Sequence, residues 1–193
     1  MKVGLYFGTF NPIHVGHLII ANHMVEFSDL EEIWFVVTPQ SPHKMKQSLL
    51  SNHHRYAMIY IAVEDYLKLR PSDIEFKLSQ PNYTAHTLVH LSEKFPKKEF
   101  SLIMGEDNLK TFHKWKNYEA IIDHHQIYVY PRIGGGIVTN QFKDHPKVNR
   151  VDAPIIQISA THIRKSIQQG KNVQALLPKE VWKYLDEMNF YKN

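Results

Sequence analysis

The sequence predicts an α/β protein with a doubly wound, mostly parallel sheet of the Rossmann type. Short apolar runs that stop at glycine or proline indicate buried strands. Segments between them carry apolar residues at helical spacing, and the two patterns alternate along the chain. Ligands of such sheets bind at the carboxyl ends of the strands. We therefore expect the residues just after Phe7, Val37, Met104 and Ile158 to share one crevice.

The strands are expected where apolar runs are short and bounded by turn residues. In chain order they are Val3–Phe7 before Gly8, Ile33–Val37 before Thr38-Pro39, Ile74–Leu78, Phe100–Met104 before Gly105, Gln126–Tyr130 before Pro131, and Ile155–Ile158. The helices are expected where apolar side chains recur every three or four residues. They are Val15–Phe27, Asn52–Leu69, Thr84–Phe95 with Thr84 as N-cap, Trp115–Ile122, a helix from Thr161, and a last helix from Lys179 to about Met188.

Length and composition indicate one globular domain. The 193 residues fit a single domain over 1–193, with a C-terminal helical portion from about residue 159. The chain has no cysteine, which excludes disulfides, a thiolate nucleophile and a sulfur-ligated zinc site. Polar residues follow the first apolar run too soon for a signal peptide, and no apolar run approaches the ~18 residues of a membrane helix. We expect a cytoplasmic protein.

The net charge of +4 has two interpretations. It is either ordinary surface charge or the sign of a positive cleft for a polyanionic substrate. There is no dense Lys/Arg tract of the kind that binds nucleic acid. We expect neither a nucleic acid nor a membrane as partner, and a homo-oligomer is compatible with the sequence.

The segment from Gly8 to His17 carries the strongest chemical signal, because it joins a predicted strand to a predicted helix. Gly8 lets the backbone approach a ligand closely, and a helix N-terminus offers free N–H groups to a phosphate. His14 and His17 are three residues apart, so both can face one crevice as N–H donors. Two such histidines can also be structural. A zinc site is disfavoured, because no carboxylate or third ligand lies nearby in sequence, and we predict no metal-ligating residues.

The His-x-Gly-His sequence resembles the signature of the nucleotidyltransferase superfamily, and the whole chain resembles the bacterial nicotinate-nucleotide adenylyltransferases. Further segments match in the expected order. They are Ser41-Pro42-His43-Lys44, Asn82-Tyr83-Thr84 with Thr87-Leu88, Gly105-Glu106-Asp107 with Trp115, and Ile158-Ser159-Ala160-Thr161-His162-Ile163-Arg164. The chain departs from the family at Asn11 and His86, where Asp is usual or frequent, and at Ala160, where Ser is common.

The resemblance implies which residues contact ATP. They are Gly8, Thr9, Phe10, His14, His17, Lys44, Gly105, Ile158, Ser159, Thr161 and Arg164. His14 and His17 are the implied catalytic residues, which hold phosphates and stabilise charge at the α-phosphate, while Lys44 and Arg164 grip the polyphosphate. Each also has a plainer interpretation: Lys44 as a solvated lysine, Ser159 and Thr161 as helix caps, and Arg164 as a surface ion-pair residue.

The resemblance also implies a site for the second substrate, at Tyr83, Thr84, Asp107 and Trp115. A carboxylate at Asp107 can accept hydrogen bonds from ribose hydroxyls, although it can also cap a helix. Trp115 is implied to stack on the pyridine ring, whereas a lone tryptophan is more often a core residue. Arg55 has no assigned role beyond pairing with a nearby carboxylate. We likewise assign no role to His43, His86, Arg132 or the Gly134–Gly136 loop.

The implied reaction transfers the adenylyl group of ATP to nicotinate mononucleotide, giving pyrophosphate and nicotinate adenine dinucleotide, a precursor of NAD. Catalysis of this kind depends on positioning and charge stabilisation, with Mg²⁺ held mostly by the ATP phosphates and water. Two alternatives remain open. One is a related transferase that acts on nicotinamide mononucleotide or phosphopantetheine, and the other is a nucleotide-binding regulatory protein without activity.

Overall fold

The computed structural model describes residues 1–39, 49–133, 141–142 and 144–192. Within these ranges six strands form one sheet. They are β1 (Lys2–Gly8), β2 (Glu32–Val37), β3 (Leu69–Ser72), β4 (Glu99–Gly105), β5 (Ile127–Tyr130) and β6 (Val148–Arg150). The strand order is β3-β2-β1-β4-β5-β6 and every neighbouring pair is parallel. This is the doubly wound Rossmann order, so the predicted fold class is confirmed, and the order reverses between β1 and β4.

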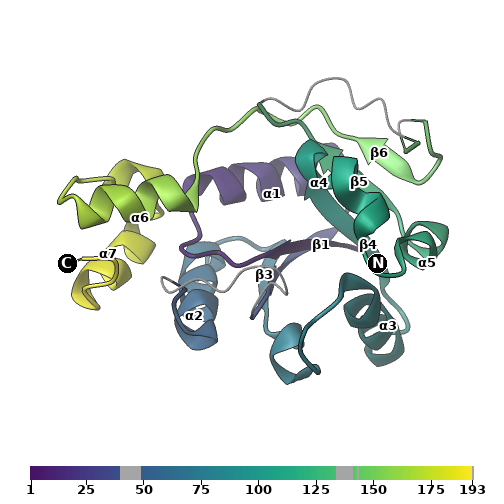
Figure 1. Ribbon diagram of the computed structural model, residues 1–193, viewed down its shortest axis with the longest axis horizontal. Coiled ribbons are helices and arrows are strands. Elements are labelled where there is room, and N and C mark those ends of the chain that lie inside the picture. The colour runs from purple at the N-terminus through teal and green to yellow at the C-terminus, as the bar shows by residue number, and fades with distance from the viewer. Residues whose placement is uncertain (40–48, 134–140, 143, 193) are drawn as a thin grey trace.

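Helices cover both faces of the sheet. They are α1 (Val15–Phe27), α2 (Asn52–Val63), α3 (Thr84–Lys94), α4 (Glu106–Thr111), α5 (Tyr118–His124), α6 (Ala160–Gln168) and α7 (Lys179–Glu187), with short 3₁₀ turns η1 (Ile74–Lys77), η2 (Phe112–Lys114) and η3 (Gln174–Leu176). Figure 1 shows α1 and α3 on opposite sides of β1, and α6 and α7 together at one end of the molecule. No helix of the described ranges is both long enough and apolar enough to cross a membrane.

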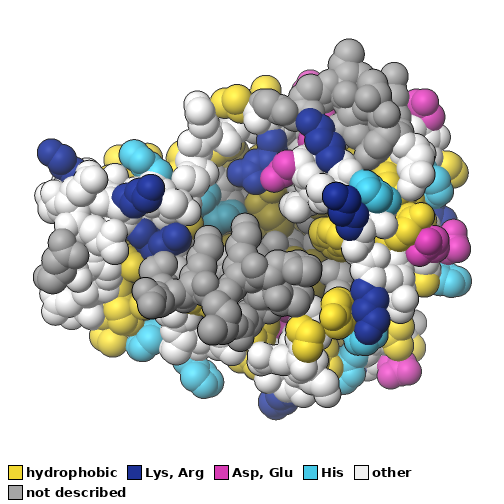
Figure 2. Space-filling view, viewed as in Figure 1, with side chains coloured by type: hydrophobic (Ala, Val, Ile, Leu, Met, Phe, Trp, Pro, Cys, Tyr) yellow, Lys and Arg dark blue, Asp and Glu magenta, His cyan; other side chains and the backbone are white. Residues whose placement is uncertain are grey.

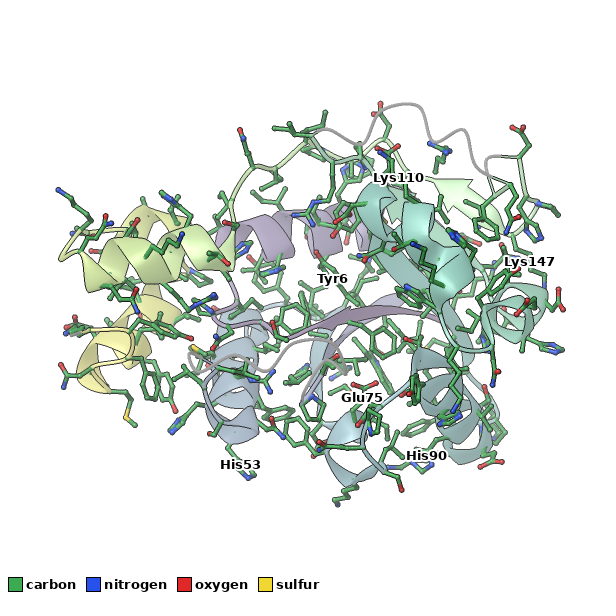
Figure 3. The ribbon with its side chains drawn as sticks, in the orientation of Figure 1. Tyr6, His53, Glu75, His90, Lys110 and Lys147 are labelled. Atoms are coloured by element: carbon green, nitrogen blue, oxygen red, sulfur yellow. The ribbon has the colours of Figure 1, made fainter. Side chains whose placement is uncertain are left out.

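Successive side chains of a strand point to opposite faces of the sheet, so each central strand contributes to two separate hydrophobic cores. Val3 and Leu5 of β1 pack into a core with α3, α4 and α5. Tyr6, which points to the other face, packs into a core with α1, α2, α6 and α7. Figure 3 shows Tyr6 on the α1 side of β1 and Glu75, from η1, on the opposite side. The C-terminal helices therefore share a core with the helix that follows the Gly8–His17 segment.

The predicted strand at Ile74–Leu78 is wrong. Ile74–Lys77 forms η1, and the third strand is β3, six residues after the end of α2 at Val63. The predicted helix up to Leu69 therefore ran past its true end and into this strand. Pro71 lies in β3, which is an edge strand, so its missing N–H removes no bond from the centre of the sheet.

Other elements also differ from expectation. The predicted strand at Ile155–Ile158 is wrong, because the sixth strand is β6 and Ile155 is exposed. Tyr83 is the N-cap of α3 and Thr84 its first residue, and α5 begins at Tyr118 rather than at Trp115. Helix α1 spans the predicted range residue for residue.

Candidate active site

A cleft of about 270 Å³ opens at the carboxyl ends of β1, β4 and β5. The residues predicted to contact ATP that line it are Gly8, Thr9, Phe10, His14, His17, Ile158 and Ser159. The expected crevice is thus built by the chain after Phe7, at Met104 and after Ile158. The chain after Val37 is described only as far as Pro39, and Lys44 lies outside the described residues. Figure 2 shows this face hollowed, with histidine in the hollow and Lys and Arg side chains around it.

The two histidines of the cleft stack on each other, with ring centroids 3.7 Å apart. The backbone N–H of His14 donates to Nδ1 of His17 at 3.2 Å, so the neutral His17 ring carries its proton on Nε2. Burial lowers the pKa of His14 from 6.5 to about 4, helped by the charge of Arg132. Burial also lowers the pKa of His17 well below 6.5, and His14 and Arg132 act in the same direction. Both rings are therefore neutral hydrogen-bonding groups at pH 7.

Arg132 and a tyrosine pair complete the cleft, and sequence reasoning assigned neither. Arg132 lines the cleft just after β5 and forms an ion pair with Asp107, Nη1 to Oδ2 3.5 Å. The hydroxyls of Tyr6 and Tyr130 lie 3.2 Å apart, and burial raises both pKa values, so both keep their protons. One proton serves the bond between them, which leaves the other for a ligand. The sequence feature that could have identified Arg132 as a cleft residue is its position just after the predicted strand Gln126–Tyr130.

Close approach explains the two glycines at strand ends. A Cβ on Gly8 would lie 2.9 Å from the Phe10 ring, and a Cβ on Gly105 would collide with Asp107 Oδ1. Phe10 itself adopts a left-handed backbone, with φ of 45°, and is buried against Tyr6 and His17. Side chains larger than hydrogen at Gly8 or Gly105 would displace the loop or the carboxylate.

Arg55, to which no role was assigned, is fully buried. Its hydrogen-bond partners within the described residues are backbone carbonyl oxygens and the side-chain oxygen of Asn52, and no carboxylate is among them. Its guanidinium donates to the carbonyl oxygens of Thr9 at 2.6 Å, Thr38 at 2.9 Å and Pro39 at 3.1 Å. Burial lowers its pKa to about 10, so it stays charged at neutral pH. Arg55 therefore joins the loop after β1 to the end of β2. Carbonyl partners so distant in sequence leave no pattern around Arg55 itself.

The second predicted ATP segment lies at the start of α6. Ser159 is the N-cap, and its Oγ accepts from the N–H of His162 at 3.2 Å, so the capping interpretation of Ser159 is confirmed while it also lines the cleft. Arg164 Nη1 donates to the carbonyl oxygen of Asn11 at 2.7 Å, and its Nη2 donates to Thr161 Oγ1 at 3.3 Å. Arg164 thus binds the loop after β1, and within the described part of the chain it forms no ion pair with a carboxylate.

The four residues predicted for the second substrate do not line the cleft, and Asp107 adjoins it through its ion pair with Arg132. The Nζ of Lys116 lies 4.4 Å from the centre of the Tyr83 ring, which brings the segment at the start of α3 beside the segment that follows η2. Trp115 is half-buried, with its ring 5.5 Å from that of Phe112 at the edge of a core. Asp107 is exposed in the first turn of α4, whose N-cap is Gly105, so Asp107 is not the capping residue.

Glu75 was missed, and it supports the segment that contains Tyr83 and Thr84. Its Oε1 accepts from Thr87 Oγ1 at 2.8 Å, and its backbone oxygen accepts from Asn82 Nδ2 at 2.9 Å. The side chain is buried, and burial raises the pKa of its carboxyl. Glu75 therefore fixes both ends of the segment that contains Tyr83 and Thr84.

Comparison with known proteins agrees with this geometry. The chain matches the cytidylyltransferase-like family over residues 5–166. It is 69% identical over 191 residues to a probable nicotinate-nucleotide adenylyltransferase of Christiangramia forsetii, covering 99% of this chain and 98% of that one. It is 64% identical over 192 residues to the protein of the same name from Flavobacterium johnsoniae, covering 100% of both.

Solved structures share the fold. The Plasmodium falciparum nicotinic acid mononucleotide adenylyltransferase complexed with NaAD superposes with a TM-score of 0.80 at 20% identity, covering 98% of this chain and 97% of that one. A structure of the same enzyme complexed with APC gives a TM-score of 0.78 at 20% identity, covering 98% and 96%. The full-length identities decide the family, and the chain belongs to the nicotinate-nucleotide adenylyltransferases.

Proposed function

We propose that the cleft binds ATP and that the protein transfers the adenylyl group to nicotinate mononucleotide. The observation that supports this most is the neutral, stacked pair of His14 and His17 beside Arg132, at the end of β1 where the strand order reverses. Family membership supports the substrates, because the named relatives are nicotinate-nucleotide adenylyltransferases. A cytoplasmic location and a single domain over 1–193 belong to the same proposal.

In this reaction a 5′-phosphate oxygen of the mononucleotide attacks the α-phosphorus of ATP. A new P–O bond forms, the bond from the α-phosphorus to the bridging oxygen breaks, and pyrophosphate leaves with that electron pair. No protein nucleophile is needed, so the protein contributes position and charge stabilisation. The Nε2–H of His17 donates to the oxygens of the α-phosphate, where negative charge grows, and the α1 N-terminus adds N–H donors.

Of the other predicted ATP residues, five line the cleft: Gly8, Thr9, Phe10, Ile158 and Ser159. Gly105, Thr161 and Arg164 are not among the lining residues, and Lys44 lies outside the described part of the chain. Gly8, Thr9 and Phe10 form the loop against the phosphates, Ser159 and Thr161 open α6, and Arg164 stands beside the loop through its bond to Asn11. Arg132 supplies a further positive charge in the cleft. Because Arg132 pairs with Asp107 at only 3.5 Å between partly exposed side chains, an entering phosphate can replace that contact at small cost.

The donor set of the cleft fits Mg²⁺ that arrives with ATP. Its polar lining consists of histidine, arginine, asparagine, serine, threonine and tyrosine groups, which bind phosphate oxygens and leave other phosphate oxygens and water as metal ligands. When bound, the ion neutralises charge on the leaving pyrophosphate. Asp107, at the rim, keeps its carboxylate for the ribose hydroxyls.

The choice of nicotinate over nicotinamide rests on the segments around Tyr83 and Trp115. A carboxylate only accepts hydrogen bonds, whereas an amide also carries an NH₂ donor. The free N–H groups at the start of α3, around Tyr83 and Thr84, favour the acid. Lys116 adds a positive charge beside Tyr83, and Trp115 offers a ring for stacking.

Pyrophosphate release with ATP and a panel of phosphate acceptors tests the proposal. The panel contains nicotinate mononucleotide, nicotinamide mononucleotide and phosphopantetheine. The assignment is supported if nicotinate mononucleotide is the only acceptor of the panel that gives pyrophosphate release, or if release is much faster with it than with the other two. Faster release with phosphopantetheine or the amide would indicate a related transferase, and no release with any acceptor would favour the regulatory alternative.

A further inference from the structure

The loop after β1 holds a conformation that needs support from outside. Phe10 has φ of 45°, a left-handed conformation that residues other than glycine adopt only at an energetic cost. The next residue, Asn11, is buried, and its side-chain Oδ1 accepts two hydrogen bonds. One comes from the N–H of Leu50 at 3.2 Å and the other from the hydroxyl of Tyr191 at 2.5 Å.

Tyr191 reaches this loop from the far end of the chain. It follows α7 and lies beyond residue 166, where the match to the family ends. Asn189 and Tyr191 have φ of 54° and 61°, so the chain turns sharply twice after α7. Figure 1 marks the C-terminus beside α7, at the α6–α7 end of the molecule. Two left-handed turns without glycine indicate that the position of Tyr191 is strongly specified.

The surroundings of Tyr191 favour this hydrogen bond. Burial raises the pKa of its hydroxyl, so the group remains protonated and donates. The positive charges of Arg164 and Arg55 both interact with this hydroxyl and oppose part of the rise in its pKa. Those two arginines bind the backbone on either side of Phe10, through the carbonyl oxygens of Thr9 and Asn11. Tyr191 thus completes a set of three side chains that hold one short loop.

We propose that Tyr191 is a positioning residue for adenylyl transfer, which fixes the Asn11 amide and thereby the shape of the ATP-binding loop. The inference rests on the proposed function of the cleft. The segment after α7 that contains Tyr191 then has a role in the active site, in addition to its packing in the core shared with α2. A purely structural anchor would affect stability alone, whereas a positioning residue affects ATP affinity and turnover at unchanged fold.

The molecule offers a matched control in Tyr184. Its hydroxyl also joins the C-terminal helices to α2, through a 2.8 Å bond to His54 Nδ1, and within the described residues it has no hydrogen bond to the loop after β1. Tyr184→Phe and Tyr191→Phe each remove one hydroxyl and leave the ring. We expect a comparable, small change in Tm for the two variants. Tyr191→Phe should weaken ATP binding about five- to tenfold, the size of one net hydrogen bond, while Tyr184→Phe stays within about twofold of wild type.

A double-mutant cycle identifies the partner. Asn11→Leu removes the acceptor, and if the two residues act through their mutual bond, Tyr191→Phe has little further effect in that background. Binding of ATP, measured by calorimetry on the full chain, does not depend on the acceptor substrate. Wild type that binds ATP but releases no pyrophosphate would count against the proposed function, not against Tyr191. Equal losses for Tyr184→Phe and Tyr191→Phe, or no loss for Tyr191→Phe, would overturn the positioning role.

Discussion

Replacing His14 with glutamine should change how the stability of the protein depends on pH. His14 is 5% exposed, and its pKa is lowered from 6.5 to about 4, mainly by burial. Between these values the unfolded chain binds a proton at this residue and the folded chain does not, so acid favours unfolding. Each pH unit in this window corresponds to about 1.4 kcal/mol. Wild type should therefore lose about 2–3 kcal/mol more than His14→Gln between about pH 7.5 and pH 4.5.

Urea denaturation at the two pH values measures this difference. The absolute stability of His14→Gln at neutral pH is not the readout, because the substitution also changes packing. His17 remains in both proteins and contributes in the same direction, since its pKa is lowered too. Equal acid losses in wild type and His14→Gln would show that His14 is not held neutral by burial, and the electrostatic description of the cleft would be wrong.

Four further outcomes are expected for the catalytic assignment. His17→Ala should lower kcat on the order of 10²–10³-fold with little change in ATP affinity or Tm, and near-normal kcat would remove His17 from the mechanism. Arg164→Lys should raise the KM for ATP at nearly constant Tm, because lysine lacks the planar fork; a fall in Tm with unchanged kinetics would make Arg164 purely structural. Trp115→Ala should weaken the binding of nicotinate mononucleotide and of nicotinamide mononucleotide by the same factor. A change in KM that differs between the two substrates would argue against simple stacking. In wild type kcat/KM for the acid should exceed that for the amide by at least ~10²-fold, and comparable values would reject the nicotinate preference alone.

The sequence predicted the elements whose pattern is local. The spacing of apolar residues defined α1 from Val15 to Phe27, and the strand-glycine-helix pattern placed His14 and His17 in one cleft. The strand prediction was wrong where apolar residues line the cleft and do not belong to the sheet. Ile156 and Ile158 line the cleft instead of forming a strand, while β6 contains only Val148, Asn149 and Arg150 and lacks a continuous apolar run.

Long-range hydrogen bonds explain the residues that were missed. Arg55 binds carbonyl oxygens up to 46 positions away, and Tyr191 binds Asn11 across 180 positions. Neither bond leaves a motif around the donor, because the partner is a backbone group or a distant side chain. Glu75 is similar, since it supports Tyr83 and Thr84 from η1 without contacting the cleft. Such supporting residues follow only from the folded arrangement.

The fate of the α-phosphorus of ATP tests the central claim most directly. The protein is incubated with Mg²⁺, nicotinate mononucleotide and ATP labelled in its α-phosphate, and the products are separated. Attack by the 5′-phosphate on the α-phosphorus predicts that the label appears in nicotinate adenine dinucleotide, with one unlabelled pyrophosphate released for each dinucleotide. Label that remains in ADP or AMP, with no labelled dinucleotide, would contradict adenylyl transfer by this cleft.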